Sequence, residues 1–306
     1  MRVLIAYDGS AHAKAAIDDL HRAGLPRHTE AIVASVAHRG WPHAKTEGQP
    51  GPFEGPWKAT MKEAEALAEE GKSRVHSLFP AWSVSCEALW GDPAATLLKM
   101  IDVWKPDLVV VGSHGRSVTA RLFLGSVSAE LIHHAPCSVR VVRQPGSVEG
   151  PIRILIATDG SDEAQACVDA VARRSWPEGT VARILGVMQT LVPTMPVMAP
   201  ALEAQTFATE PAARVIEESD ARERVKLRWT VDGGANRLQQ AGLIADAVVV
   251  DGDARQEIIA EAERWKADSV FVGARGLGAL DRLLLGSVST AVVHHAACAV
   301  EVVRRK

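Results

Sequence analysis

The chain has 306 residues, of which 47% are hydrophobic and 23% are charged. At roughly 150 residues per domain, this length predicts two domains, and the composition excludes a largely disordered chain. The 34 basic and 37 acidic side chains give a net charge of -3. No overall positive field would attract DNA or RNA, so we expect no nucleic-acid partner.

Cysteine content and the first residues bear on the cellular compartment. The four cysteines stand far apart and form neither a C-x-x-C pair nor the framework of a disulfide-rich domain, which favours a reducing environment. The apolar run after Met1 is too short for a signal peptide because Asp8 interrupts it. No stretch approaches the roughly 18 apolar residues of a membrane-spanning helix. We therefore expect a cytoplasmic protein with no membrane partner.

Short apolar runs alternate with segments of helical periodicity from the N-terminus onward. Strands are predicted over residues 3–6, 31–37, 82–89, 108–111 and 138–142. Helices are predicted over residues 11–23, 57–78, 93–104 and 126–134. Five strands separated by helices predict an α/β fold with a parallel, doubly wound sheet. The ligand site of such a sheet lies beyond the carboxyl ends of its strands.

The second half of the chain repeats the first. Residues 112–143 align without a gap on residues 273–304, at an offset of 161, with 17 identities in 32 positions. Near the start, residues 5–10 match residues 156–161 at an offset of 151. The second half therefore contains about ten additional residues, and we expect them near residues 229–242.

A repeat of this length indicates a duplicated domain rather than a solenoid. The segment 144–151 has the Gly and Pro content of a linker. We therefore predict two domains, copy one over residues 1–143 and copy two over residues 152–306.

Each copy contains the same glycine-rich loop after its fourth strand, with the spacing G-x-x-G-x9-G-S. The motif residues are Gly112, Gly115, Gly125 and Ser126 in copy one, and Gly273, Gly276, Gly286 and Ser287 in copy two. Glycines at a strand end permit close backbone approach to a ligand and positive φ, while the Gly-Ser step begins a helix with free N–H groups. One G-x-x-G would more often be a tight turn, but two copies with equal spacing favour a phosphate-binding loop.

With this motif, and with Asp8 and Asp159 at the end of the first strand of each copy, the chain resembles the universal stress protein family. The resemblance is to its tandem two-domain form and its ATP-binding branch. It implies two Rossmann-like doubly wound domains, each with a five-stranded parallel sheet flanked by helices, packed about a pseudo-two-fold axis.

The resemblance also implies a nucleotide site in each copy. The glycines and the Gly-Ser step would hold the triphosphate, the aspartate would lie near the ribose or a phosphate-bound metal, and backbone at the second strand end would contact adenine. The implied cofactor is ATP, with Mg²⁺ as a candidate companion. The implied residues are Asp8, Val36, Gly112, Gly115, Gly125, Ser126, Val127, Asp159, Val187, Gly273, Gly276, Gly286, Ser287 and Val288.

Single-domain relatives of this family commonly dimerise through the last strand. We therefore expect the two copies to pair through residues 138–142 and 299–303, each an apolar run with an edge to cover. An intramolecular pseudo-dimer follows, with a homodimer of chains as a further candidate state. An isolated copy one is expected to self-associate through the same strand.

Several side chains near the motif have two interpretations. Asp8 is suited either to a ligand or to stabilising the start of the first helix. Arg116 is an additional phosphate candidate because it follows Gly115, and its counterpart is Leu277, so copy one is expected to bind more tightly. The His-His pairs at 133–134 and 294–295 are not expected to bind metal, since adjacent helical side chains point about 100° apart. No metal-binding side chains are predicted.

Motifs of other nucleotide-binding classes are missing: there is no G-x-x-x-x-G-K-[ST] and no G-x-G-x-x-G after the first strand. No second titratable group recurs in both loops, because His114 is replaced by Arg275. The sequence favours an ATP-binding stress-response regulator with no catalytic residue and an unknown protein partner. A slow ATPase and an interaction module with vestigial sites remain open, and so does the role of the Gly/Pro-rich segment 38–56. Segment 190–200 is apolar enough to serve as a lid or a partner contact, or it is a variable surface loop.

Overall fold

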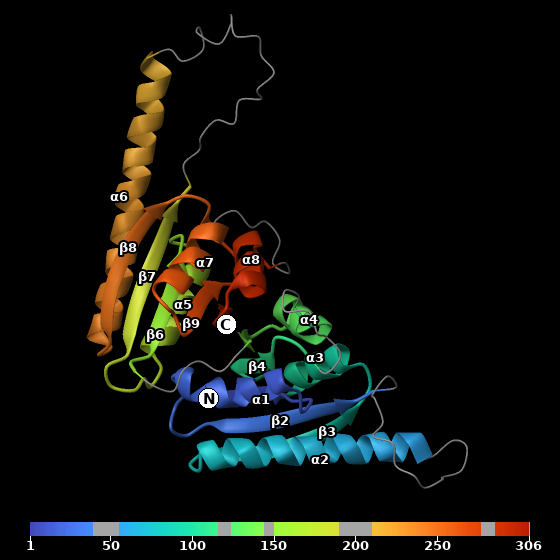
Figure 1. Cartoon of the computed structure of the whole chain (residues 1–306). Coiled ribbons are helices and arrows are strands. Elements are labelled where there is room, and N and C mark those ends of the chain that lie inside the picture. The colour runs from blue at the N-terminus through green and yellow to red at the C-terminus, as the bar shows by residue number, and fades with distance from the viewer. Residues whose placement is uncertain (39–54, 116–123, 144–149, 190–209, 277–284, 306) are drawn as a thin grey trace, which may run out of the picture.

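The computed structural model describes residues 1–38, 55–115, 124–143, 150–189, 210–276 and 285–305 (Figure 1). Strands and helices alternate in both copies, as predicted. Copy one contains β1 (Arg2–Ala6), α1 (Ala11–Asp18), the 3-10 helix η1 (Asp19–Arg22), β2 (Glu30–Ala37), α2 (Gly55–Leu78), β3 (Ser83–Trp90), α3 (Pro93–Trp104), β4 (Leu108–Gly112), α4 (Ser126–His134) and β5 (Ser138–Val142). Copy two contains β6 (Arg153–Thr158), α5 (Asp162–Ala172), β7 (Val181–Met188), α6 (Glu210–Gln240), β8 (Ile244–Asp251), α7 (Ala254–Arg264), β9 (Ser269–Gly273), α8 (Ser287–His295) and β10 (Ala299–Val303).

The strands of the two copies form one ten-stranded sheet in the order β3-β2-β1-β4-β5-β10-β9-β6-β7-β8. All neighbouring pairs are parallel except β5 with β10, which are antiparallel. We call this antiparallel pairing the seam. It confirms the expected contact between the last strands. The two five-stranded sheets are thus halves of one continuous sheet, a feature that the sequence patterns of either copy do not contain.

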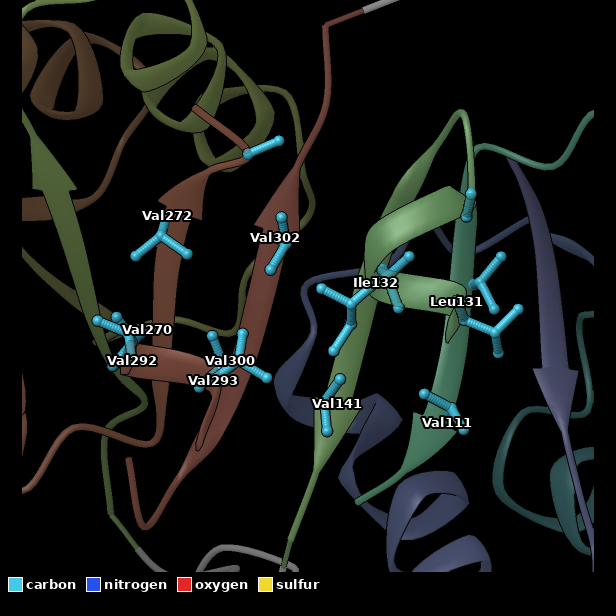
Figure 2. Close-up of a cluster of buried hydrophobic side chains, with 14 of the residues drawn as sticks. Val111, Leu131, Ile132, Val141, Val270, Val272, Val292, Val293, Val300 and Val302 are labelled. Carbon is cyan, nitrogen blue, oxygen red and sulfur yellow. The ribbon is translucent and has the colours of Figure 1, made fainter. Parts of the chain in front are cut away.

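One face of this sheet carries a hydrophobic core that crosses the seam. Helices α3 and α4 from copy one and α7 and α8 from copy two contribute to it. Figure 2 shows Val141 of β5 and Val300 of β10 on neighbouring strands at its centre, and these two residues are paired in register. On the opposite face the cores are separate, one under α1 and α2 and the other under α5 and α6. One hydrophobic cluster therefore spans both copies widely on the first face, whereas the opposite face has two clusters.

The additional residues of copy two lie earlier than expected. Strands β2 and β7 still correspond at an offset of 151, and β3 and β8 already correspond at an offset of 161. The insertion is therefore between Met188 and the end of α6, which has 31 residues against 24 in α2. The expected position near residues 229–242 was wrong, because that segment overlays the last turns of α2. Figure 1 shows α6 extending beyond the ends of β7 and β8. Among the described residues, no helix is long and apolar enough to cross a membrane.

Candidate functional site

The candidate site of copy one lies at the carboxyl ends of β1 and β4. Asp8 follows β1, and its Oδ1 accepts a hydrogen bond of 3.0 Å from the Ser10 N–H. Gly9 makes this tight turn possible with a φ of 75°. Ser10 caps α1 by accepting a hydrogen bond from the Ala13 N–H. The cap of α1 is therefore Ser10, which leaves Asp8 to shape the turn before it.

The other oxygen of this aspartate faces the glycine loop. A Cβ added to Gly115 would stand 2.9 Å from Asp8 Oδ2, and one added to Gly276 would stand 2.4 Å from Asp159 Oδ2. Both distances are shorter than normal van der Waals contacts. The absence of a side chain at the second glycine thus allows a carboxylate to lie against the loop in both copies. The structure thus brings Asp8 to Gly115, and Asp159 to Gly276.

A pair of hydrogen bonds holds the start of the following helix against the end of the strand. In copy one, the Gly125 N–H donates to Ser113 O at 2.7 Å, and Ser128 Oγ donates to Gly112 O at 2.7 Å. The equivalent distances in copy two are 2.8 Å and 2.5 Å. Residues Ser126 and Ser287 are exposed at these helix starts. The N–H groups of a first helical turn have no partner within the helix, so both starts are suited to an anion.

The six glycines of the motif do not have the backbone conformation that we expected. None of them has a positive φ. Two are explained by helix packing: a Cβ on Gly112 would lie 2.6 Å from the His12 carbonyl carbon, and one on Gly273 would lie 3.0 Å from Glu163 Cβ. These glycines therefore let α1 and α5 approach β4 and β9 closely. At these two positions the motif requires glycine because a side chain would collide with the helix, and not because the backbone is left-handed.

The second strands end beside the same sites. Pairing of β2 with β1 stops at Ala34, whereas its pairing with β3 continues to Ala37. Val36 therefore lies on a stretch whose edge toward β1 has no strand partner among the described residues. Val187 holds the same position in β7 of copy two. The side chain of Val36 is buried in the core, so only its backbone is suited to a ligand.

The two sites differ in one pair of contacting side chains. In copy one, His12 of α1 and His114 of the loop have ring centroids 5.1 Å apart. In copy two, the same positions hold Glu163 and Arg275, which form an ion pair of 2.5 Å. The His114 side chain is buried, its Nδ1 lies 3.0 Å from Ser113 Oγ, and its Nε2 has no hydrogen-bond partner among the described residues. Burial lowers the pKa of His114, and His12 and Arg143 lower it further.

Some of the predicted residues lie outside the part of the chain that the structure describes. Arg116 and Leu277 are among them, and so are residues 39–54 and 190–200 of the two open segments. Among the described residues, no group of three or more His, Cys, Asp or Glu side chains could hold a metal ion. At the end of α4, His134 lies 3.3 Å from Glu130 on its own helix.

The fold and the sites define a tandem α/β protein with the same strand-end loop in each half. Residues 1–143 and 152–304 each match the Universal stress protein family, and the chain belongs to this family. It is 28% identical to the universal stress protein Rv2005c of Mycobacterium tuberculosis over 99% of this chain and 97% of the relative. It is 34% identical to a Thermus aquaticus universal stress protein that covers 46% of this chain and is itself covered over 97%.

Solved structures support the same fold over the whole chain. A universal stress protein from Archaeoglobus fulgidus superposes with a TM-score of 0.64 at 18% identity, covering 100% of this chain and 98% of its own. Protein PA1789 from Pseudomonas aeruginosa superposes with a TM-score of 0.58 at 15% identity, covering 99% of this chain and 92% of its own. The Rossmann-like α/β fold predicted from the sequence is confirmed.

Proposed function

We propose that this protein is a stress-response regulator that binds one ATP molecule in each copy. One observation carries the proposal: an aspartate carboxylate, a glycine without room for a side chain and the start of a helix converge at the carboxyl ends of parallel strands, twice in one chain. This is where doubly wound sheets bind ligands. Membership of the universal stress protein family supports it.

Each part of the site is suited to one part of the nucleotide. The N–H groups at the starts of α4 and α8, around Ser126 and Ser287, would bind phosphate oxygens. The carboxylates of Asp8 and Asp159 would lie near the ribose or bind a phosphate-bound Mg²⁺, because carboxylate oxygens are ligands that Mg²⁺ prefers. The unpaired backbone edge beside Val36, and its equivalent at Val187, would recognise the edge of adenine.

Regulation is favoured over catalysis by what the two sites have in common. Hydrolysis would require a base and a means of orienting water. The only titratable side chain that the described parts of both sites share is the aspartate, since His114 in one site corresponds to Arg275 in the other. Bound ATP would therefore act by changing the conformation of the chain or its affinity for a protein partner.

The proposal is tested by extracting nucleotide from the purified full chain and by titrating ATP into the nucleotide-free protein in a calorimeter, with and without Mg²⁺. We expect extracted adenine nucleotide and a stoichiometry of two. Gly125→Leu and Gly286→Leu should each reduce the stoichiometry to one, because the new side chain occupies the helix start where the phosphates would bind. Gly233→Ala is the control, since nothing lies within 4 Å of a Cβ added there.

A chain that retains no nucleotide and releases no heat on titration would contradict the proposal and favour an interaction module. ATP turnover with Mg²⁺ that is abolished by the same two substitutions would favour the ATPase alternative. Unfolding curves of each variant separate loss of binding from loss of folding.

A further inference from the structure

Four charged side chains lie in a row across the seam, on the face of the sheet that carries α1 and α5. Arg140 of β5 is 0% exposed and bonds Asp19 of η1, which is 1% exposed, through its Nε at 2.8 Å. Glu301 of β10 is 0% exposed and forms an ion pair with Arg174 of copy two. Arg140 Nη1 stands 3.6 Å from Glu301 Oε2. The charges therefore alternate in sign along the row, from Asp19 through Arg140 and Glu301 to Arg174.

Arg140 and Glu301 occupy a special position in the seam. They are paired in register, with Val139 opposite Val302 and Val141 opposite Val300. At the offset of 161, Val300 is the counterpart of Val139 and Val302 is the counterpart of Val141, so the two valine pairs are equivalent to each other. The local pseudo-two-fold axis thus passes between Arg140 and Glu301, which are counterparts of each other. If two identical copies paired in this way, the residue on the axis would lie opposite the same residue of the other copy, Arg140 opposite Arg140 or Glu301 opposite Glu301.

Some other contacts of the seam are the same in both directions. The Arg143 side chain donates to the carbonyl oxygens of Val293 and His294 at the end of α8. Its counterpart Arg304 donates to the equivalent carbonyl oxygens of Ile132 and His133 at the end of α4. The valines beside the axis are also equivalent. These contacts would form equally well between identical copies, so they cannot select a partner.

We infer that the Arg140 and Glu301 pair makes the last strand of each copy select the other copy and reject an identical one. This inference opposes the expectation from the sequence that an isolated copy one self-associates through this strand. Pairing of copy one with copy one would place two guanidinium groups face to face in a seam from which water is excluded. Pairing of copy two with copy two would do the same with two carboxylates. Like charges in such contact are strongly unfavourable, whereas the unlike pair is attractive.

A second asymmetric contact lies at the edge of the same interface. The Trp176 ring of copy two packs on Gly24 of copy one, where a Cβ would stand 2.6 Å from the ring. Ser175, beside Trp176, donates its N–H to Gly24 O at 3.0 Å. Gly24 corresponds to Ser175 in copy two, so two identical second copies would force this ring against a residue that has a side chain. Shape and charge therefore favour the same pairing.

The test uses the full chain with a protease site in segment 144–149, cleaved after folding so that the halves remain associated. Isotope-labelled and unlabelled cleaved proteins are mixed, and denaturant is raised until the halves exchange. Native mass spectrometry then counts the three possible pairs. For the natural sequence we expect mixed pairs only, with like pairs about tenfold or more below their statistical share, because like charges in contact cost several times the free energy of a tenfold preference.

Substitutions on the two sides of the seam should each allow a different like pair to form. Arg140→Met removes the repulsion between two first copies and should allow pairs that consist of two first copies. Glu301→Gln combined with Trp176→Leu, which introduces the residue type found at the equivalent Leu25, removes both obstacles between second copies and should allow pairs of two second copies. Arg140→Lys keeps the charge and should keep the selectivity. Val302 is a buried neighbour of Glu301 on β10. Val302→Ala loosens the seam without changing the charged pair at the pseudo-two-fold axis, so it should also keep the selectivity.

Statistical amounts of like pairs in the natural sequence would overturn the inference. So would mixed pairs alone in Arg140→Met, or in Glu301→Gln combined with Trp176→Leu, because the selection would then lie elsewhere. The two variants act on different halves, so either one that folds gives a decisive result.

Discussion

At the scale of single residues, His114 differs from an ordinary surface histidine. It is buried beside His12, and its pKa is lowered chiefly by burial. A histidine in an unfolded chain has a pKa of about 6.5. Below that pH the unfolded state binds more protons than the folded state. The free energy of unfolding therefore decreases as the pH falls from about 6.5 toward the lowered pKa of the folded protein.

The first prediction concerns this pH dependence. His114→Gln should make the free energy of unfolding less dependent on pH below about 6.5, because the buried group no longer titrates. Urea unfolding at a series of pH values measures it. His28→Gln is the control, since His28 is exposed. Equal slopes for the natural protein and His114→Gln would contradict the prediction. Part of the slope should remain in the variant, because burial also lowers the pKa of His294.

At the scale of elements, the close approach of α1 to β4 depends on Gly112. The nearest atoms to an added Cβ are backbone atoms of His12 and Ala13, at 2.6 Å and 2.8 Å. Backbone cannot move aside as a flexible side chain can. Gly112→Ala should therefore force the helix away from the strand. By contrast, Gly233 lies in the interior of α6 with open space around it.

The second prediction compares these two glycines by urea unfolding. Gly112→Ala should lower the free energy of unfolding by roughly 1 to 3 kcal/mol, the usual range for overpacking. Gly233→Ala should raise it by about 0.5 to 1 kcal/mol, because alanine favours a helix interior over glycine. A stabilising Gly112→Ala would show that the helix and strand are not in the contact described.

Much of this architecture could be predicted from the sequence, and the exceptions have physical reasons. The strands were predictable because short apolar runs are typical of buried parallel strands, and the proximity of Asp8 to Gly115 follows from parallel strand order. The extra residues of copy two were misplaced because α6 continues one helical pattern without a break. The seam charges were missed because Arg140 and Glu301 are single charged residues within apolar strands, and their pairing depends on contact between the copies.

At the scale of the whole molecule, the seam joins the two halves through charges that water does not reach. Burial raises the pKa of Asp19, while Arg140 opposes this rise. Removing Arg140 would leave a buried carboxylate without its partner. Breaking a buried pair in this way typically costs about 3 to 5 kcal/mol. Exposed pairs contribute about 1 kcal/mol or less.

The third prediction follows from this difference. Arg140→Met should lower the free energy of unfolding at pH 7 by about 3 to 5 kcal/mol. The loss should shrink at acid pH, because Asp19 with its raised pKa then takes up a proton in the folded protein. Arg74→Met, which breaks the more exposed pair with Asp18, should cost about 1 kcal/mol or less. Equal losses in urea unfolding for the two variants would contradict the prediction.

The continuous sheet also determines where chains could add to one another. Because β5 and β10 pair with each other, the two edge strands of the sheet in the described part of the chain are β3 and β8, at its opposite ends. Both edge strands have exposed acidic side chains, Glu87 on β3 and Asp246 and Asp251 on β8. Charged side chains on an edge strand oppose the addition of another strand. The fusion of two copies thus removes two apolar strand edges from contact with solvent and leaves outward edges that resist fibre growth.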